Sequence, residues 1–144
     1  MACAFVCIGC DYLGLSKAEA EVLPKERGNL YVQSIENARK SFDYFNQCLK
    51  QADGKHFRVK IAITKKGETP EIIWVTKVSQ PQKGVFKGVL ETNSRSLAKD
   101  KGTSIMVSTR QIVDWSFERS GRLYGNFTEI ASGYQRVKNT PKPN

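Results

Sequence analysis

The sequence predicts an α+β fold in which one amphipathic helix packs on a five- to six-stranded, mainly antiparallel sheet or small barrel. One stretch has apolar residues at helical spacing, and the stretches after it alternate apolar and polar residues as strands do. These strand-like stretches follow one another through short turns, without a helical pattern between them. With 144 residues, 40% of them hydrophobic and 26% charged, the chain is long enough for one core.

The predicted helix begins at Ser34 and ends at Asp53-Gly54. Ser34 is of the type that caps helix N-termini, and Gly54 is of the type that ends helices. The apolar residues between them recur at spacings of three and four and therefore share one stripe of the helix: Ile35, Ala38, Phe42, Phe45 and Leu49. A stripe of this kind is typical of a helix that packs against a core.

A period of two begins after Lys55 and predicts the first strand. Its buried face would hold Phe57, Val59, Ile61 and Ile63, and its wet, basic face would hold Arg58, Lys60, Ala62 and Thr64. Residues 65–70 have the composition of a hairpin connection. Residues 72–75 are apolar on both faces, which predicts a central strand covered on one side by the helix.

The rest of the sheet is predicted from further short runs. A turn at 80–84 leads into a strand at 85–92, and a polar stretch at 93–102 precedes a short strand at 105–107. The last two strands are predicted at 111–118 and 123–130, joined by a turn at 119–122.

The domain organisation predicted is a leader and linker at 1–33, one folded domain at 34–130 and a flexible basic tail at 131–144. The longest apolar run, residues 2–9, has eight residues, far below the roughly 20 of a membrane-spanning helix. It resembles the end of a bacterial lipoprotein signal before Cys10, which predicts lipidation of Cys10. The alternative is an ordinary N-terminal segment in the cytoplasm.

The cysteine and histidine content argues against metal chemistry. Cys3, Cys7 and Cys10 have the spacing of an iron–sulfur motif, but the motif starts at residue 3, with no preformed fold around it. The single histidine, His56, excludes a two-histidine metal site, and we predict neither a metal nor a cofactor. The net charge of +9 favours a polyanionic partner, which could be nucleic acid, an anionic membrane surface or an acidic protein.

Several polar and aromatic residues are candidates for a site. Strand alternation puts Trp115 with Val113 and Phe117, and Asp114 with Ile112 and Ser116. Our main interpretation is that Asp114 ties a strand end or turn together and that Trp74 and Trp115 are core residues. The alternative gathers Asp114, His56 and Asn126 in one polar cleft. Gly125 is best explained by close backbone approach or a bulge.

The order of several motifs carries a family resemblance. They are residues 56–60 (HFRVK), 71–75 (EIIWV), 88–90 (GVL) with Asn93, 101–102 (KG), 112–117 (IVDWSF) and 125–128 (GNFT). From Ile35 to Ile130 the chain resembles the YegJ-like bacterial family, catalogued as domain of unknown function 2314. It departs from that pattern at Thr103, where an acidic residue is common. The resemblance implies an export signal and no particular activity.

The function we expect is that of a non-catalytic binding or interaction module at the cell envelope or in the periplasm. Its sheet would present a polar face to an acidic protein or another polyanion, formed by Arg58, Lys60, Arg122, Tyr124 and Asn126. The alternatives are a cytoplasmic single-stranded nucleic-acid-binding domain that stacks bases on Tyr124, a toxin immunity protein, and an enzyme with His56 and Asp114 as acid–base partners.

Overall fold

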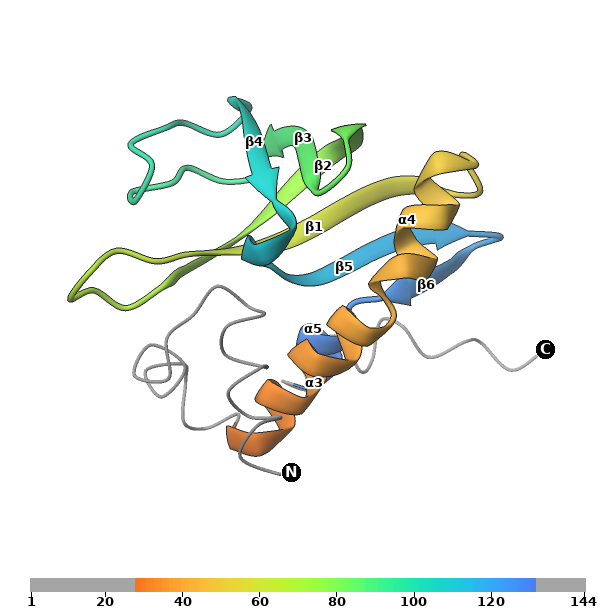
Figure 1. The fold of residues 1–144 in the computed structure, drawn as a ribbon, viewed down its shortest axis with the longest axis horizontal. Helices are drawn as coiled ribbons and strands as arrows, with labels where there is room; N and C mark the ends of the chain where they lie inside the picture. Colours follow the sequence, from red (N-terminus) through yellow and green to blue (C-terminus); the bar gives the residue numbers. More distant parts are fainter. Residues whose placement is uncertain (1–27, 132–144) are drawn as a thin grey trace.

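Residues 28–131, which the computed structural model describes, form an open antiparallel sheet with helices packed against it (Figure 1). The strands lie in the order β4-β3-β2-β1-β5-β6, so β4 and β6 are the two edges. The strands are β1 (Lys55–Ile63), β2 (Glu71–Gln82), β3 (Val85–Leu90), β4 (Ser104–Ser108), β5 (Ile112–Arg119) and β6 (Arg122–Gly125). The predicted α+β class is confirmed, and the sheet is not closed into a barrel.

Two helices stand where the sequence predicts one. The first, α3 (Gly28–Lys40), and the second, α4 (Phe42–Lys50), are separated at Ser41. Helical structure thus begins earlier than predicted: Gly28–Gln33 belongs to α3, and the Ser34 hydroxyl, inside the helix, donates to the Tyr31 carbonyl at 2.6 Å. The early start has a tertiary cause, because Tyr31 and Ile35 are buried against Ala62 and Val113 of the sheet. The rest of the predicted leader, with Cys10, and the predicted tail after residue 131 lie outside the described residues.

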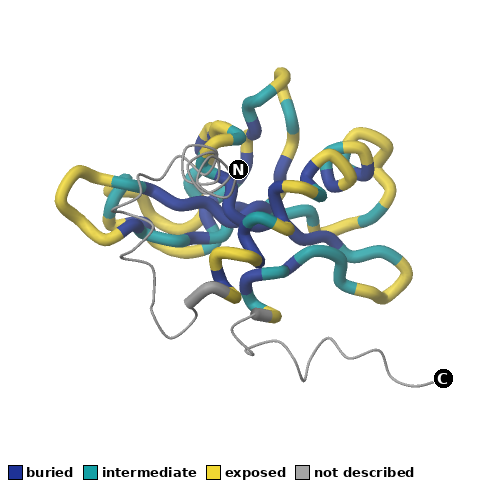
Figure 2. Tube along the Cα trace, turned by 60° about the horizontal axis from the view of Figure 1, so that its bottom comes forward, coloured by how far each residue is buried: buried dark blue, intermediate teal, exposed yellow. Residues whose placement is uncertain are grey.

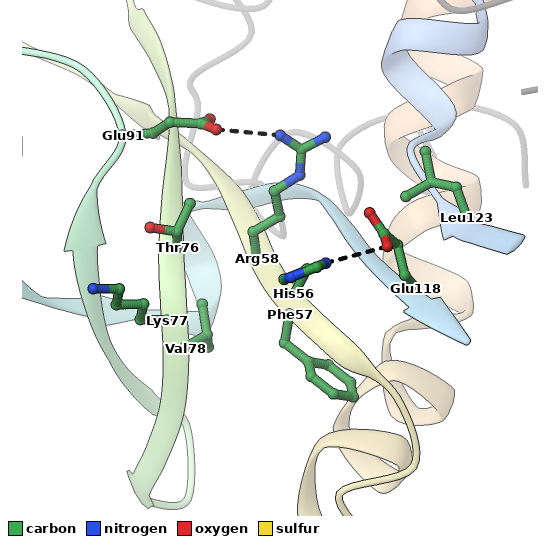
Figure 3. Close-up of a pocket in the computed structure, with 9 residues that line it drawn as sticks. All are labelled: His56, Phe57, Arg58, Thr76, Lys77, Val78, Glu91, Glu118 and Leu123. Carbon is green, nitrogen blue, oxygen red and sulfur yellow. Dashed lines mark hydrogen bonds and ion pairs between the residues drawn. The ribbon is translucent and has the colours of Figure 1, made fainter. Parts of the chain in front are cut away.

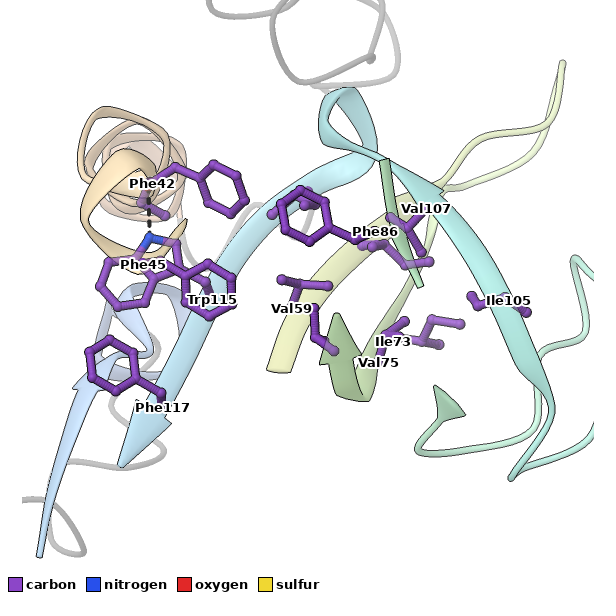
Figure 4. Close-up of a cluster of buried hydrophobic side chains, with 14 of the residues drawn as sticks. Phe42, Phe45, Val59, Ile73, Val75, Phe86, Ile105, Val107, Trp115 and Phe117 are labelled. Carbon is purple, nitrogen blue, oxygen red and sulfur yellow. Dashed lines mark hydrogen bonds between the residues drawn. The ribbon is translucent and has the colours of Figure 1, made fainter. Parts of the chain in front are cut away.

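We call the side of the sheet that faces α4 the core face. Phe42 and Phe45 of α4 point toward Trp115 and Phe86 in a single apolar cluster (Figure 4). The Trp115 indole Nε1 donates to the Ala38 carbonyl at 2.9 Å, which ties the C-terminal end of α3 to β5. The predicted stripe is therefore largely buried as expected. Two of its residues differ: Ile35 packs in a separate small cluster with Ala62 and Val113 of the sheet, and Leu49 is only partly buried.

The opposite side, which we call the second face, holds Arg58, Trp74 and Ser116. The sequence predicts it to be wet along β1, and this is wrong for Lys60 and Ala62, which are 5% exposed. The reason is a second layer: α3 packs on Ala62, and the short helix α5 (Phe127–Ala131) lies beside α3 and covers Lys60. Residues 126–130, predicted as the end of a strand, thus belong mainly to α5.

A bulge in β5 changes the predicted alternation. Lys60 lies opposite Asp114, and Ile61 opposite Ile112, so Val113 is an extra residue. Ile112 consequently joins the core with Trp115 and Phe117, whereas the sequence predicts that it shares a face with Asp114. Val113 packs with α3 instead.

The strands β1 and β2 pair over only part of their lengths. Their pairing runs from Ile63 opposite Glu71 to Val59 opposite Val75. Beyond that point β1 continues along β5, and β2 continues along β3 as far as Gln82, past the start of the predicted turn at 80–84. We call the resulting gap between the strands the fork. Burial is greatest in the middle of the strands and least at the hairpin tips (Figure 2).

Candidate functional site

The fork contains a pocket of about 640 Å³. Its walls combine apolar and charged side chains from both diverging strands and from the ends of β3, β5 and β6 (Figure 3). The lining residues are His56, Phe57, Arg58, Thr76, Lys77, Val78, Glu91, Glu118 and Leu123. Of these, the sequence singled out His56 and Arg58.

Two bulges shape the pocket, one in each strand. The register of β1 shifts between Lys55 and Arg58, and that of β2 shifts between Thr76 and Ser79. Inside these shifts His56 has a φ of 54° and Lys77 a φ of 51°, a left-handed conformation that side chains other than glycine seldom adopt. Bulges re-aim side chains and end strand pairing, so both contribute to the opening of the fork.

Arg58 is the best-oriented cation of the pocket. Its guanidinium carbon lies 4.2 Å from the centre of the Trp74 ring, and its Nε donates to the Ser116 hydroxyl at 2.8 Å. Its Nη1 is 3.5 Å from a Glu91 carboxylate oxygen, a long contact for an ion pair with a partly exposed side chain. The stacking and the Ser116 hydrogen bond therefore fix the guanidinium plane, while Glu91 holds it only loosely.

His56 pairs with Glu118, not with Asp114. Its Nδ1 is 3.1 Å from the Glu118 carboxylate, and both side chains are largely exposed. Asp114 lies opposite Lys60, which is four residues after His56 along β1. At the usual strand rise, those four residues separate His56 from Lys60 by about 13 Å. The alternative of a shared cleft for His56, Asp114 and Asn126, and the acid–base pair built on the first two, are both wrong.

Asp114 is fully buried and accepts hydrogen bonds at both carboxylate oxygens. The backbone N–H groups of Trp115, Phe127 and Thr128 donate at 2.8, 3.2 and 2.8 Å, and the Thr128 hydroxyl donates at 2.6 Å. Burial raises the pKa of the Asp114 carboxyl, and the hydrogen bonds from Thr128 and the nearby charge of Lys60 oppose this rise. Asp114 thus holds the start of α5 against β5, as our main interpretation predicts.

Lys60 extends the same polar network. Its Nζ is 2.8 Å from the Thr128 hydroxyl and 2.6 Å from a Glu129 carboxylate oxygen, and it lies over the Trp74 ring at 4.8 Å from the centre. Trp74 is therefore not a core residue as predicted: Arg58 and Lys60 both stack on it on the second face. Lys60 is buried and binds Thr128 and Glu129 of α5, so its ammonium group is not on the surface for a partner to contact.

Three other predicted site residues do not form a polar face with Arg58. Tyr124 stands opposite Phe117 and stacks on its ring, with the Arg119 guanidinium 4.6 Å from the Tyr124 ring centre. Arg122 stands opposite Arg119 on the same side of the sheet. Asn126 is fully buried, with a positive φ of 60° and a side-chain amide that has no hydrogen-bond partner among the described residues. The predicted single polar face is therefore wrong, because Tyr124 and Arg122 lie on the core side.

Gly125 confirms the predicted close approach. Its φ is +76°, and a Cβ atom there would lie 2.2 Å from the Trp115 carbonyl oxygen. Trp115 is a core residue, also as predicted.

Sequence reasoning missed Glu91, Glu118 and Trp74 as neighbours of the predicted cations. A hairpin centred on Gly67 sets Lys60 opposite Trp74, so a register drawn from the 65–70 turn would have found that contact. No comparable signal relates Glu91 or Glu118 to β1, because their positions depend on the fork and on the pairing with β5.

Within residues 28–131, no three His, Cys, Asp or Glu side chains are grouped so as to hold a metal ion. No helix in that range is long and apolar enough to cross a membrane. Cys48 is buried and forms no disulfide among the described residues.

Comparison with known proteins supports the family resemblance that the motifs indicate. The model of DUF2314, described as an uncharacterized protein conserved in bacteria, matches residues 30–137. The chain is 31% identical over 96 residues to "Uncharacterized protein YegJ" of Escherichia coli strain K12, over 66% of this chain and 61% of that protein. It thus spans less than two thirds of that relative's length. No solved structure matches significantly. The chain belongs to the DUF2314 family of bacterial proteins, the family that its motifs resemble.

Proposed function

We propose that this protein is a non-catalytic binding module whose ligand is an acidic, extended segment of a partner protein, held in the fork. The observation that carries the proposal is the oriented guanidinium of Arg58 at the wall of a mixed apolar and charged pocket.

The hydrogen bonds of Arg58 leave room for a carboxylate. Within the described chain its Nε donates to Ser116 and its Nη1 makes the long contact to Glu91, and Nη2 has no hydrogen-bond partner. A ligand carboxylate can take the two Nη groups together, a planar geometry that arginine matches well. Because Trp74 already fixes the guanidinium plane, little side-chain entropy is lost on binding.

The fork also suits an extended chain. Beyond Val59 and Val75 each strand keeps a neighbour on one side only, so the backbone edges that face the pocket are not joined to each other. Peptides bind such edges by adding main-chain hydrogen bonds, and nearby pockets take alternate side chains. Phe57, Val78 and Leu123 supply apolar surface for those side chains.

The polar network supports a binding role over catalysis. The Asp114 carboxylate is fully buried and occupied by the start of α5, so it is not positioned as a general base for a bound molecule. His56 pairs with an exposed glutamate at the pocket rim.

We test the site with a short blocked peptide of alternating glutamate and valine as the probe. Binding is followed by tryptophan fluorescence, to which Trp74 and Trp115 both contribute, and by backbone amide shifts, which we expect at the fork. Arg58→Gln should weaken binding roughly tenfold or more, because a charge-assisted hydrogen bond is lost. Arg110→Gln, an exposed arginine outside the pocket, is the matched control and should bind as the wild type does.

An alternating lysine and valine peptide should not bind. Equal affinity of wild type and Arg58→Gln, with both proteins folded by thermal melting, would refute the proposal. Amide shifts centred away from the fork would also refute it, and preferential binding of single-stranded oligonucleotide would favour the nucleic-acid alternative.

The envelope setting is part of the proposal and is supported by the sequence around Cys10 alone. Cells that express the gene with its upstream region are fractionated, and the mass of the mature N-terminal peptide is measured by mass spectrometry. A diacylated Cys10 in the membrane fraction is the expected result. An intact Met1 in the cytosol would place the module in the cytoplasm.

A further inference from the structure

The edge strand β4 is symmetric in sequence. Residues 103–109 read Thr-Ser-Ile-Met-Val-Ser-Thr, which is the same in both directions except that isoleucine and valine exchange. The centre of symmetry is Met106. β4 pairs with β3 on one side and has no neighbouring strand on the other among the described residues.

The backbone hydrogen bonds at the two ends of β4 show which of its backbone groups face outward. Leu90 N–H donates to the Thr103 carbonyl, and Thr109 N–H donates to the Gly84 carbonyl. In an antiparallel pair the hydrogen-bonded residues alternate, so Ile105 and Val107 also turn their backbone groups toward β3. The outward N–H and C=O groups therefore belong to Ser104, Met106 and Ser108, which are symmetric about Met106.

This edge lacks the usual protection against pairing. Exposed edges commonly carry lysine or proline, and β4 contains neither. Its exposed side chains are two serines and Met106, which is 58% exposed although it is large and apolar.

We propose that two copies of this chain associate edge to edge through β4, antiparallel about a two-fold axis at Met106. Met106 would then pair with the partner's Met106, and Ser104 with the partner's Ser108, through all the outward backbone groups of the strand. Ile105 would stand opposite the partner's Val107, so apolar residues meet on the core face and no charges oppose each other. A sequence that is its own reverse is self-complementary in this arrangement, as an isologous interface requires.

The dimer is expected to be weak. Two five-residue strands bury less surface than the 1,200 Å² or so of a standard interface, so association should depend on concentration in the micromolar range or above. The fork lies between β1 and β2, away from β4, and stays open in both copies. The proposal is therefore independent of what the fork binds.

Sedimentation of the full chain over a range of concentrations tests the association. We expect a monomer–dimer equilibrium for the wild type. Met106→Lys should weaken it roughly tenfold or more, because two ammonium groups then meet at the axis. Met106→Thr, a neutral residue that favours strands, is the matched control and should still associate.

The decisive measurement mixes two variants. Met106→Lys and Met106→Glu should each be mainly monomeric, and an equal mixture should form a heterodimer, because only a two-fold axis at this residue sets the two side chains opposite each other. Circular dichroism confirms that both variants are folded, since the exposed site tolerates charge. A wild type that stays monomeric up to millimolar concentration, or a mixture that does not associate, would overturn the proposal.

Discussion

Asp114 shows how one buried carboxylate joins two elements. It accepts three backbone N–H groups and one hydroxyl, and so binds the start of α5 to β5. In Asp114→Asn, the amide nitrogen cannot accept the hydrogen bonds from Thr128, and buried donors are left without a partner. We expect a loss of about 2–4 kcal/mol in the free energy of unfolding, measured by urea denaturation.

Asp100→Asn is the matched control for this variant, because the Asp100 side chain is exposed. Its unfolding free energy should stay within about 0.5 kcal/mol of the wild type. An equally small change for Asp114→Asn would mean that Asp114 does not hold α5.

Gly125 and Gly121 form a natural pair for a test of close packing. Both have positive φ values, +76° and +73°, but a Cβ at Gly125 would collide with the Trp115 carbonyl, whereas a Cβ at Gly121 meets nothing within 4 Å. Gly121→Ala should cost about 1 kcal/mol from backbone strain alone. Gly125→Ala should cost at least about 2 kcal/mol more by the same denaturation measurement, because the collision is with backbone. Equal costs would contradict the close approach.

At single residues, the sequence predicts best where the reason is local. A glycine beside a strand end predicts close backbone approach, and an aspartate among apolar neighbours predicts a structural tie; both are confirmed for Gly125 and Asp114. Asn126 and Lys60 were expected at a displayed polar face and are buried. Their burial depends on α5 and on its packing beside α3, which a strand-like reading of residues 123–130 does not contain.

Among the strands, β1 and β2 each contain one non-glycine residue with a positive φ, His56 and Lys77. Lys77 has a φ of 51° inside the β2 bulge, a conformation that glycine adopts without steric cost. We expect Lys77→Gly to keep or raise the free energy of unfolding. Lys87→Gly, an exposed position of β3 without positive φ, should lose about 1 kcal/mol. Thermal or urea unfolding of the two variants measures the difference, and an equal loss in both would show that the bulge is unstrained.

The elements themselves were predicted largely from hydrophobic period. The strand alternation and the turn at 65–70 correctly place β1, the first part of β2 and the hairpin between them, but β2 continues to Gln82, into the predicted turn at 80–84. The break at Ser41 was not predicted, because the apolar spacing continues unchanged from Ala38 to Phe42 and gives no signal of two helices. The bulges at Lys77 and Val113 likewise follow from how neighbouring strands fit, and neither position has a glycine to mark it.

On the scale of the whole molecule, protection of backbone amides should be highest in β1 and β5, which lie beside the helices, and lowest at the outer edge of the sheet. β1 and β5 each have a strand on both sides, and Val59, Ile112 and Val113 are buried almost completely. In dilute solution we expect the slowest amide hydrogen exchange in β1 and β5 and fast exchange at the outward amides of β4. Exchange measured by NMR at single residues checks this order, and β4 amides as slow as those of β1 would contradict an open edge.

The fold class was predictable because it depends on period and on turn spacing. Whether the sheet closes was not, since closure depends on whether β4 and β6, which lie near each other in the chain but at opposite ends of the strand order, become neighbours. The fork was not predictable either. Beyond Val59 and Val75, β2 stays paired with the next strand along the chain, β3, but β1 pairs with β5, a segment distant in the sequence.

The strand order also has a kinetic consequence. β1 to β4 follow one another as a meander, so each new pairing closes only a short loop and can form early. β5 must instead return to β1, with Val59 opposite Trp115 and the whole meander between them. That closure carries the largest chain-entropy cost among these pairings and brings Trp115 under α4 in the same event. Substitutions at the β1–β5 seam therefore act on the folding rate more than those in the outer hairpins.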